Sequence, residues 1–227
     1  ALVGYTNAGK STLFNRMTRA SVLSADMLFA TLDPTLRAID LPHGSRVILS
    51  DTVGFISDLP TTLVAAFRAT LEEVIEADVI LHVRDISHED AAAQSRDVEH
   101  VLGELGIEPA DPRLIEVWNK IDRLDPDGRA RADNLAERQP AERRPVMVSA
   151  LSGEGIDALD GAIETRLSEK RQTLSLSLDP ADGAGLSWLY RHAEVLTRDL
   201  GDDGRLAVTV RADAANADIV RRKYAAI

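Results

Sequence analysis

A glycine-rich run near the start of the chain, GYTNAGKST, holds residue types that could bind phosphate. From Gly4 to Ser11 it matches the pattern G-x-x-x-x-G-K-[ST], in which glycines let backbone N–H groups turn inward around an anion. Lys10 could reach the outer phosphates of a nucleotide, and the Ser11 hydroxyl could hold Mg²⁺. The alternative is a glycine turn with a solvated lysine. Because a strand-like stretch precedes the run and a helical pattern follows it, we expect a phosphate-binding loop.

A second motif, DTVG, spans Asp51 to Gly54 and follows a predicted strand. Asp51 could fix Mg²⁺ through a water molecule, and the Gly54 amide could sense the terminal phosphate. Between the two motifs, the segment MLFATLDPTLR (residues 27 to 37) occupies the place of a switch loop. The hydroxyl of Thr31 or of Thr35 could close over Mg²⁺ when the terminal phosphate is present. Of the two, we favour Thr31.

Two further motifs indicate which base is bound. NKID runs from Asn119 to Asp122, and SAL covers residues 149 to 151. The Asp122 carboxylate can accept hydrogen bonds from N1–H and the 2-amino group of guanine but would repel the ring acceptor of adenine. The Ala150 amide could donate to guanine O6. All four motifs occur in the required order at the ends of predicted strands, so we predict a site for GTP and GDP with Mg²⁺.

The sequence leaves the catalytic arrangement open. Many GTPases carry a polar side chain just after the D-x-x-G glycine that orients the attacking water, but here Phe55 and Ile56 follow Gly54. Phe55 could simply pack against the domain, and hydrolysis would then depend on something else. A partner's arginine can raise the rate by about 10³ to 10⁵, so we expect slow turnover by the protein alone. Asn7 could help to hold K⁺ against the phosphates, or it could only stabilise the turn.

The predicted site residues fall into three groups. Catalytic roles are expected for Lys10, Thr31 and Gly54, and the expected metal ligands are Ser11, Thr31 and, through water, Asp51. The predicted nucleotide contacts are Gly4, Tyr5, Thr6, Asn7, Ala8, Gly9, Lys10, Ser11, Thr12, Phe29, Ala30, Thr31, Leu32, Asp33, Asp51, Thr52, Val53, Gly54, Asn119, Lys120, Asp122, Ser149, Ala150 and Leu151.

Short strand-like runs alternate with longer helical ones along most of the chain. The expected strands open the chain (ALVG) and recur at residues 35–40, 46–51, 78–85, 113–120 and 145–150, with the one at 35–40 antiparallel. The expected helices cover residues 11–18, 61–75, 89–105, 129–137 and 156–169. Strands rich in Val, Ile and Leu between helices predict a P-loop NTPase fold, a doubly wound and mostly parallel α/β sheet.

The pattern changes near residues 171 to 174. An alternating strand (QTLSLSLDP), an amphipathic helix at 185–200, a GDDG turn, a second alternating strand (RLAVTVRA) and a helix at 216–226 are expected after it. We therefore predict a nucleotide-binding domain at residues 1–171 and a small α+β C-terminal domain at residues 172–227.

Composition limits the class of protein. The net charge of −11 argues against wrapping of nucleic acid by the whole surface, because phosphate contacts need clustered Lys and Arg. The absence of cysteine excludes a disulfide framework and thiolate metal sites. The sequence contains no run of about 18 apolar residues, the length that could span a bilayer. We expect a cytoplasmic monomer.

With these motifs in view, the chain resembles the HflX family of bacterial GTPases. The resemblance is carried by GYTNAGKSTLFN (residues 4–15), LFATLDPT (28–35), DTVGFISDLP (51–60), NKID and SAL, and the tail from about residue 174 resembles the family's small C-terminal domain. Members carry a further N-terminal domain and a helical linker, so the chain looks like a fragment that starts within the first strand. It departs from the common DPTTR, because Leu36 replaces the second threonine, and this favours Thr31 as the metal ligand.

The resemblance implies GTP-dependent binding to the large ribosomal subunit, hydrolysis stimulated there and, in some members, splitting of stalled ribosomes. A different hypothesis is a nucleotide-dependent binding module whose GTP-bound state, rather than its turnover, carries the function. A third is an ATPase or a small-molecule kinase on the same phosphate loop, which predicts that Asp122→Asn leaves nucleotide choice unchanged.

Overall fold

The computed structural model describes residues 1–19, 35–42, 44–52, 54–55, 68–169, 172–201, 204–212 and 214–224. Six predicted site residues lie outside these ranges: Phe29, Ala30, Thr31, Leu32, Asp33 and Val53. The beginning of the helix expected at residues 61–75 also lies outside them. The chain divides into two compact units, Ala1–Thr165 and Arg166–Ile227, whereas the sequence pattern put the boundary near residue 171.

The larger unit contains a six-stranded sheet in the order β2-β3-β1-β4-β5-β6. Its strands are β1 (Leu2–Val3), β2 (Thr35–Asp40), β3 (Arg46–Asp51), β4 (Ile80–Asp85), β5 (Leu114–Asn119) and β6 (Val146–Met147). Neighbouring strands are parallel except β2, which runs antiparallel to β3. The prediction of a mostly parallel α/β sheet is confirmed. In the central strand β4, Ile80, Leu81 and Val83 are at most 1% exposed, since both faces of the sheet are covered.

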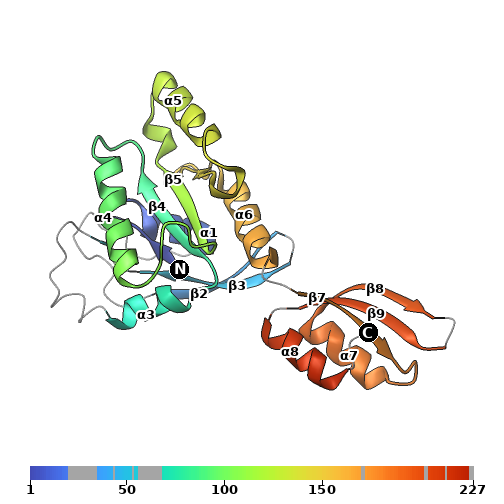
Figure 1. Cartoon of the computed structure of the whole chain (residues 1–227). Helices are drawn as coiled ribbons and strands as arrows, with labels where there is room; N and C mark the ends of the chain where they lie inside the picture. The colour runs from blue at the N-terminus through green and yellow to red at the C-terminus, as the bar shows by residue number, and fades with distance from the viewer. Residues whose placement is uncertain are drawn as a thin grey trace. The chain divides into compact units, whose positions relative to one another are not determined.

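The described helices that begin in this unit are α1 (Lys10–Thr18), α3 (Arg68–Glu76), α4 (Ala91–Glu104), α5 (Pro126–Glu137) and α6 (Ile156–Glu169), with 3-10 turns at Ile121–Arg123 and Ala141–Arg143. Figure 1 shows β4 and β5 between α4 and α6. The apolar face of α4 places Val98 and Leu102 in one core cluster with Val3 and Ile80. Among the described residues, no helix is both long and apolar enough to cross a membrane.

Helix α5 begins earlier than the expected range of 129–137. The Asp125 carboxylate accepts a hydrogen bond from the Gly128 amide at 2.6 Å, and Pro126 occupies the first turn. An aspartate cap followed by proline is a favourable helix start, because proline needs no hydrogen-bond partner for its nitrogen there. The start signal therefore lay in the residues just before the periodic pattern.

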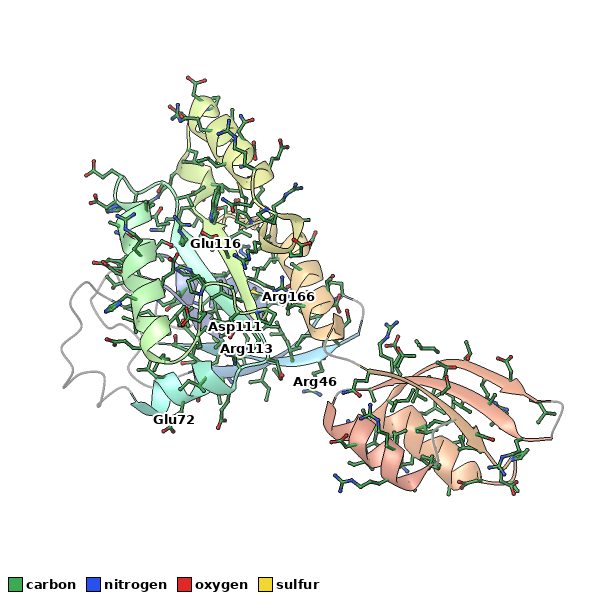
Figure 2. All side chains as sticks on the ribbon, in the orientation of Figure 1. Arg46, Glu72, Asp111, Arg113, Glu116 and Arg166 are labelled. Carbon is green, nitrogen blue, oxygen red and sulfur yellow. The ribbon has the colours of Figure 1, made fainter. Side chains whose placement is uncertain are left out.

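At the amino ends of the strands, Arg113, labelled with Asp111 in Figure 2, joins two elements. Its guanidinium pairs with the Asp111 carboxylate at 2.8 Å and donates to the main-chain oxygen of Ile75 at 2.7 Å. The second bond lies at the carboxyl end of α3, where a cation is favourable. Arg113 thereby ties the start of β5 to the end of α3, at the edge of the sheet opposite to the motifs.

The second unit is an antiparallel sheet with two helices. Its elements are β7 (Gln172–Leu178), α7 (Gly183–His192), β8 (Glu194–Leu200), β9 (Leu206–Ala212) and α8 (Ala214–Lys223), and the strand order is β7-β9-β8. The alternating residues Leu174, Leu176 and Leu178 of β7 are buried, as the pattern predicts. Leu176 packs with Val208, Leu189 and Val220. The unit is thus α+β, with a core of its own.

The expectation of a helix at residues 185–200 is wrong in its second half. Helix α7 ends at His192, Ala193 is extended (φ −147°), and Glu194–Leu200 forms the edge strand β8. This segment pairs with β9 from Glu194 to Leu200, with a register shift between Val195 and Thr197. Strands β8 and β9 form a hairpin across the short connection between Leu200 and Leu206, and the helical period of residues 185–200 hid this pairing.

Candidate nucleotide site

The phosphate-binding loop connects β1 to the first turn of α1. Gly9 adopts a left-handed conformation (φ 95°) before Lys10, and no side chain caps the helix. Backbone amides at the N-terminus of a helix point outward and can bind an anion. Gly4 (φ 153°) lies so close to β4 that a Cβ atom would be 2.2 Å from the Val83 oxygen. Both glycines of the motif are thus required by the backbone.

Lys10 lies inside this loop. Its Nζ donates to the main-chain oxygens of Gly4 at 3.1 Å and Tyr5 at 3.0 Å, and only 6% of the residue is exposed. Burial lowers the pKa of the Lys10 ammonium from 10.5 to about 8, although the nearby Asp51 carboxylate opposes the shift. A desolvated cation enclosed by backbone is suited to bind an anionic phosphate.

The predicted metal ligands Ser11 and Asp51 come together, since Ser11 Oγ donates to Asp51 Oδ2 at 2.7 Å. A hydroxyl and a carboxylate are hard oxygen ligands of the kind that Mg²⁺ prefers, so this pair fits the metal. Beside them, the Thr52 hydroxyl donates to the Leu2 oxygen at 2.5 Å and holds the end of β3 against β1. Thr31, the third predicted ligand, lies outside the described residues.

Gly54 lies against the phosphate loop. A Cβ atom at this position would be 3.0 Å from Thr6 Cα and 3.1 Å from Lys10 Nζ. The next residue, Phe55, exchanges backbone hydrogen bonds with the loop, donating to Gly4 O at 3.1 Å and accepting from Thr6 N at 2.7 Å. Its side chain is 1% exposed and belongs to the core cluster that includes Val3. Phe55 therefore packs into the domain.

Asn119 links the phosphate loop to the SAL loop. Its Nδ2 donates to Ala8 O at 2.9 Å, and its Oδ1 accepts from the Ala150 amide at 3.0 Å. Gly9 passes so close that a Cβ atom there would lie 2.3 Å from Asn119 Nδ2. The Ala150 amide, which we predict to meet guanine O6, is thus engaged by Asn119. Guanine would have to share this donor or use the neighbouring amide of Leu151.

Lys120 makes a second link, which involves a residue that the sequence analysis missed. The backbone of Lys120 is in a left-handed conformation (φ 65°). Its Nζ donates to Asn7 O at 2.7 Å and pairs with the Asp85 carboxylate at 2.7 Å. Asp85 also accepts from the amide and the hydroxyl of Ser87. Burial alone would raise the pKa of Asp85, but the hydrogen bonds from Lys120 and Ser87 lower it below its ordinary value.

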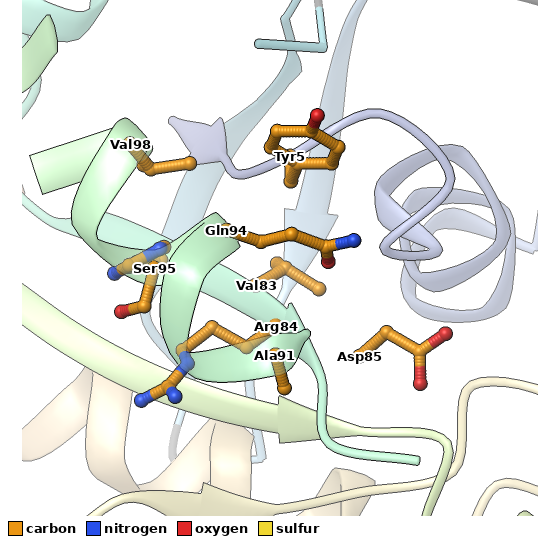
Figure 3. Close-up of a pocket in the computed structure, with 9 residues that line it drawn as sticks. Tyr5, Val83, Arg84, Asp85, Ala91, Gln94, Ser95 and Val98 are labelled. Carbon is orange, nitrogen blue, oxygen red and sulfur yellow. The ribbon is translucent and has the colours of Figure 1, made fainter. Parts of the chain in front are cut away.

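Asp85 could have been found by its position. It ends the buried run DVILHVRD, and carboxyl ends of neighbouring parallel strands meet at the ligand-binding edge of such a sheet. Figure 3 shows Asp85 at the end of β4 and Tyr5 at the start of the phosphate loop, both lining a small pocket together with Gln94 and Ser95 of α4.

The other predicted base contacts differ in exposure. Asp122 is exposed in the turn Ile121–Arg123, and no hydrogen bond or ion pair joins its carboxylate to another described residue. Ser149 is fully buried, whereas Leu151 is 72% exposed. Trp118, which directly precedes Asn119, packs in a cluster with Ala132 of α5, so its side chain contributes to the core.

Two family models match the chain. Residues 1–120 match a model described as "50S ribosome-binding GTPase", and residues 134–227 match one described as "HflX C-terminal domain". Among curated relatives, "GTPase HflX" of Magnetococcus marinus is 47% identical over 89% of this chain and 45% of that protein. "GTPase HflX" of Escherichia coli is 44% identical over 93% of this chain and 48% of that protein. The chain thus spans about half the length of these relatives.

Solved structures share the fold over about three quarters of this chain. A GTP-binding protein from Sulfolobus solfataricus in complex with GDP is 26% identical, covering 74% of this chain and 51% of that one with a TM-score of 0.56. Era in complex with MgGDPNP and a segment of 16S ribosomal RNA is 27% identical, covering 73% of this chain and 55% of that one with a TM-score of 0.57.

Proposed function

Because the chain belongs to the HflX family of GTPases, we propose that it binds GTP, hydrolyses it to GDP and phosphate, and acts as a switch on the large ribosomal subunit. The observation that carries the proposal is Asn119, which hydrogen-bonds to the phosphate loop and to the SAL loop at once. The groups expected to bind phosphate and guanine thereby form one site.

Each part of this site has a proposed role. Lys10 binds the outer phosphates, and the amides of the first turn of α1 surround them. Ser11 and Asp51 hold Mg²⁺, with Thr31 as the further ligand that the sequence predicts. When bound, Mg²⁺ neutralises charge on the phosphate oxygens. The exposed Asp122 carboxylate selects guanine by accepting hydrogen bonds that adenine cannot offer.

Turnover by the protein alone is proposed to be slow. The Phe55 side chain is buried in the core at the position where many GTPases carry a water-orienting polar residue. A group from the ribosome, or K⁺ held near Asn7, would complete the site. The burial of Phe55 also favours the second candidate function, a binding module that acts through its GTP-bound state with negligible turnover.

The proposed partner follows from the family. The model that matches residues 1–120 is described as ribosome-binding, and we propose splitting or rescue of ribosomes under stress as the outcome, as the sequence resemblance implies. Such a partner would place the protein in the cytoplasm. Its net charge of −11 requires that any contact with ribosomal RNA be local.

Phosphate release from GTP tests the proposal, with and without purified large subunits and with K⁺ or Na⁺ as the monovalent cation. We expect stimulation of at least about 10-fold by subunits, since stimulating partners add about 10³ or more in related systems. Ser11→Ala serves as the matched control that loses a metal ligand. Tight GTP binding without turnover under any condition would favour the binding module, and failure to bind guanine nucleotides would refute both functions.

A further inference from the structure

Arg16 belongs to the helix that follows the phosphate-binding loop, and its side chain contacts the SAL loop. It lies in α1, six positions after Lys10, and its Nε donates to Ala150 O at 3.0 Å. Its Nη2 donates to the next main-chain oxygen, that of Leu151. Gly153 (φ 93°) turns the chain beneath the guanidinium, where a Cβ atom would lie 3.8 Å from Arg16 Cζ. The Arg16 side chain therefore donates hydrogen bonds to two successive carbonyl groups.

These two bonds fix the direction of the peptide planes. In a trans peptide the C=O and the following N–H point in opposite directions. With Ala150 O held by Arg16, the Leu151 N–H is aimed away from the guanidinium, and no described residue accepts a hydrogen bond from it. The next amide, Ser152 N–H, donates to Ser149 Oγ at 3.0 Å. The loop is thus held with one amide left available.

The opposite side of the loop is held as well. The Ala150 amide donates to Asn119 Oδ1 at 3.0 Å, so Ala150 is fixed at its N–H by Asn119 and at its oxygen by Arg16. A planar guanidinium suits this task because its several donors have a fixed geometry. A loop that is fixed before the ligand arrives loses less conformational entropy on binding.

We propose that Arg16 is a positioning residue for guanine recognition, which orients the Leu151 amide toward O6 of the base. This inference rests on the proposed function, since it assumes that guanine occupies the site beside Asn119 and Asp122. Arg16 itself does not touch the nucleotide. Its removal weakens the hydrogen bonds to O6 and leaves those to the N1 edge in place.

The test compares GDP with 6-thio-GDP, in which a weakly accepting sulfur replaces O6 and N1–H remains. Affinities are measured by calorimetry for the full chain and its Arg16→Ala variant. A hydrogen bond of about 1.4 kcal/mol corresponds to about 10-fold, so we expect the wild-type protein to prefer GDP by about that factor. In Arg16→Ala the preference should fall to about 3-fold or less, because the two changes remove the same interaction.

Two further variants complete the design. Arg96→Ala removes another exposed arginine, on α4, that has no hydrogen bond or ion pair with the loop among the described residues, and the preference of this variant should equal that of the wild-type protein. Arg16→Lys keeps the charge but replaces the planar guanidinium and its several donors by a single ammonium group. We therefore expect this variant to prefer GDP over 6-thio-GDP by an intermediate factor. It also carries the test if Arg16→Ala does not fold, and an unchanged preference in Arg16→Lys would then overturn the inference.

The outcomes separate the two proposals. A wild-type chain that binds no GDP refutes the proposed function and this inference with it. A wild-type chain that prefers GDP, beside an Arg16→Ala variant with the same preference, leaves the function standing and overturns the role of Arg16. An equal loss of affinity for GDP and 6-thio-GDP in Arg16→Ala also overturns the role of Arg16, because it shows a general structural effect.

Discussion

Replacing Lys10 by methionine should stabilise the nucleotide-free protein while it abolishes nucleotide binding. The Lys10 ammonium is 6% exposed, and burial lowers its pKa from 10.5 to about 8. At neutral pH the folded chain therefore holds a charge in a place that disfavours it. Methionine has a similar length and carries no charge, so it removes this cost.

The magnitude follows from the pKa of Lys10. A change from 10.5 to about 8, at about 1.36 kcal/mol for each pKa unit, destabilises the wild-type protein by roughly 3 kcal/mol at neutral pH. The variant in turn leaves the oxygens of Gly4 and Tyr5 without this donor, which costs about 1–2 kcal/mol. We expect the variant to be more stable by about 1–2 kcal/mol.

The difference should depend on pH in a known direction. Between the folded pKa of about 8 and the unfolded value of 10.5, the unfolded wild-type chain binds more protons than the folded one, so wild-type stability rises with pH. The variant lacks this contribution. Its advantage should therefore shrink by roughly 2 kcal/mol between about pH 7 and about pH 9.5.

Urea unfolding of both proteins at these two pH values measures the effect. GDP at about 100 times its Kd should add about 2.7 kcal/mol to the wild-type protein and nothing to the variant. A variant that is less stable than the wild-type protein at neutral pH, or a difference that does not vary with pH, would refute the reasoning from desolvation.

Three other changes test separate contacts. Asp122→Asn should lower GTP affinity by about 10-fold or more and raise affinity for xanthosine triphosphate, because the amide offers a donor to the changed base edge; competition binding measures both. Gly9→Ala should reduce GDP affinity strongly, because its Cβ atom would lie 2.3 Å from Asn119 Nδ2 in a left-handed residue; a variant with wild-type affinity contradicts the tight approach. Asp85→Asn should speed GDP release by about 10-fold, because it weakens the ion pair that holds Lys120. Stopped-flow release of a fluorescent GDP measures this rate, and an unchanged rate would show that the ion pair is unimportant.

Much of this protein was determined by the sequence alone. The parallel sheet follows from apolar runs such as Ile80–Asp85, which can be buried only between two layers of helices. The phosphate loop could be predicted because its glycines are needed locally, to turn the backbone and to let Lys10 enter it. Local patterns also gave the alternating strands β7 and β9 of the second unit.

Only the tertiary structure decided the features that depend on pairing between elements. Strand β8 replaced the expected end of a helix because it forms a hairpin with β9, which follows after a short connection. Asp85 and Arg16 joined the site because the fold brings the end of β4 beside Lys120, and α1 beside the SAL loop. A contact such as that of Arg16 with Ala150, 134 positions apart, leaves no periodic signal in the sequence. The sequence therefore identifies the groups that could meet a nucleotide, and the fold determines which side chains hold those groups in place.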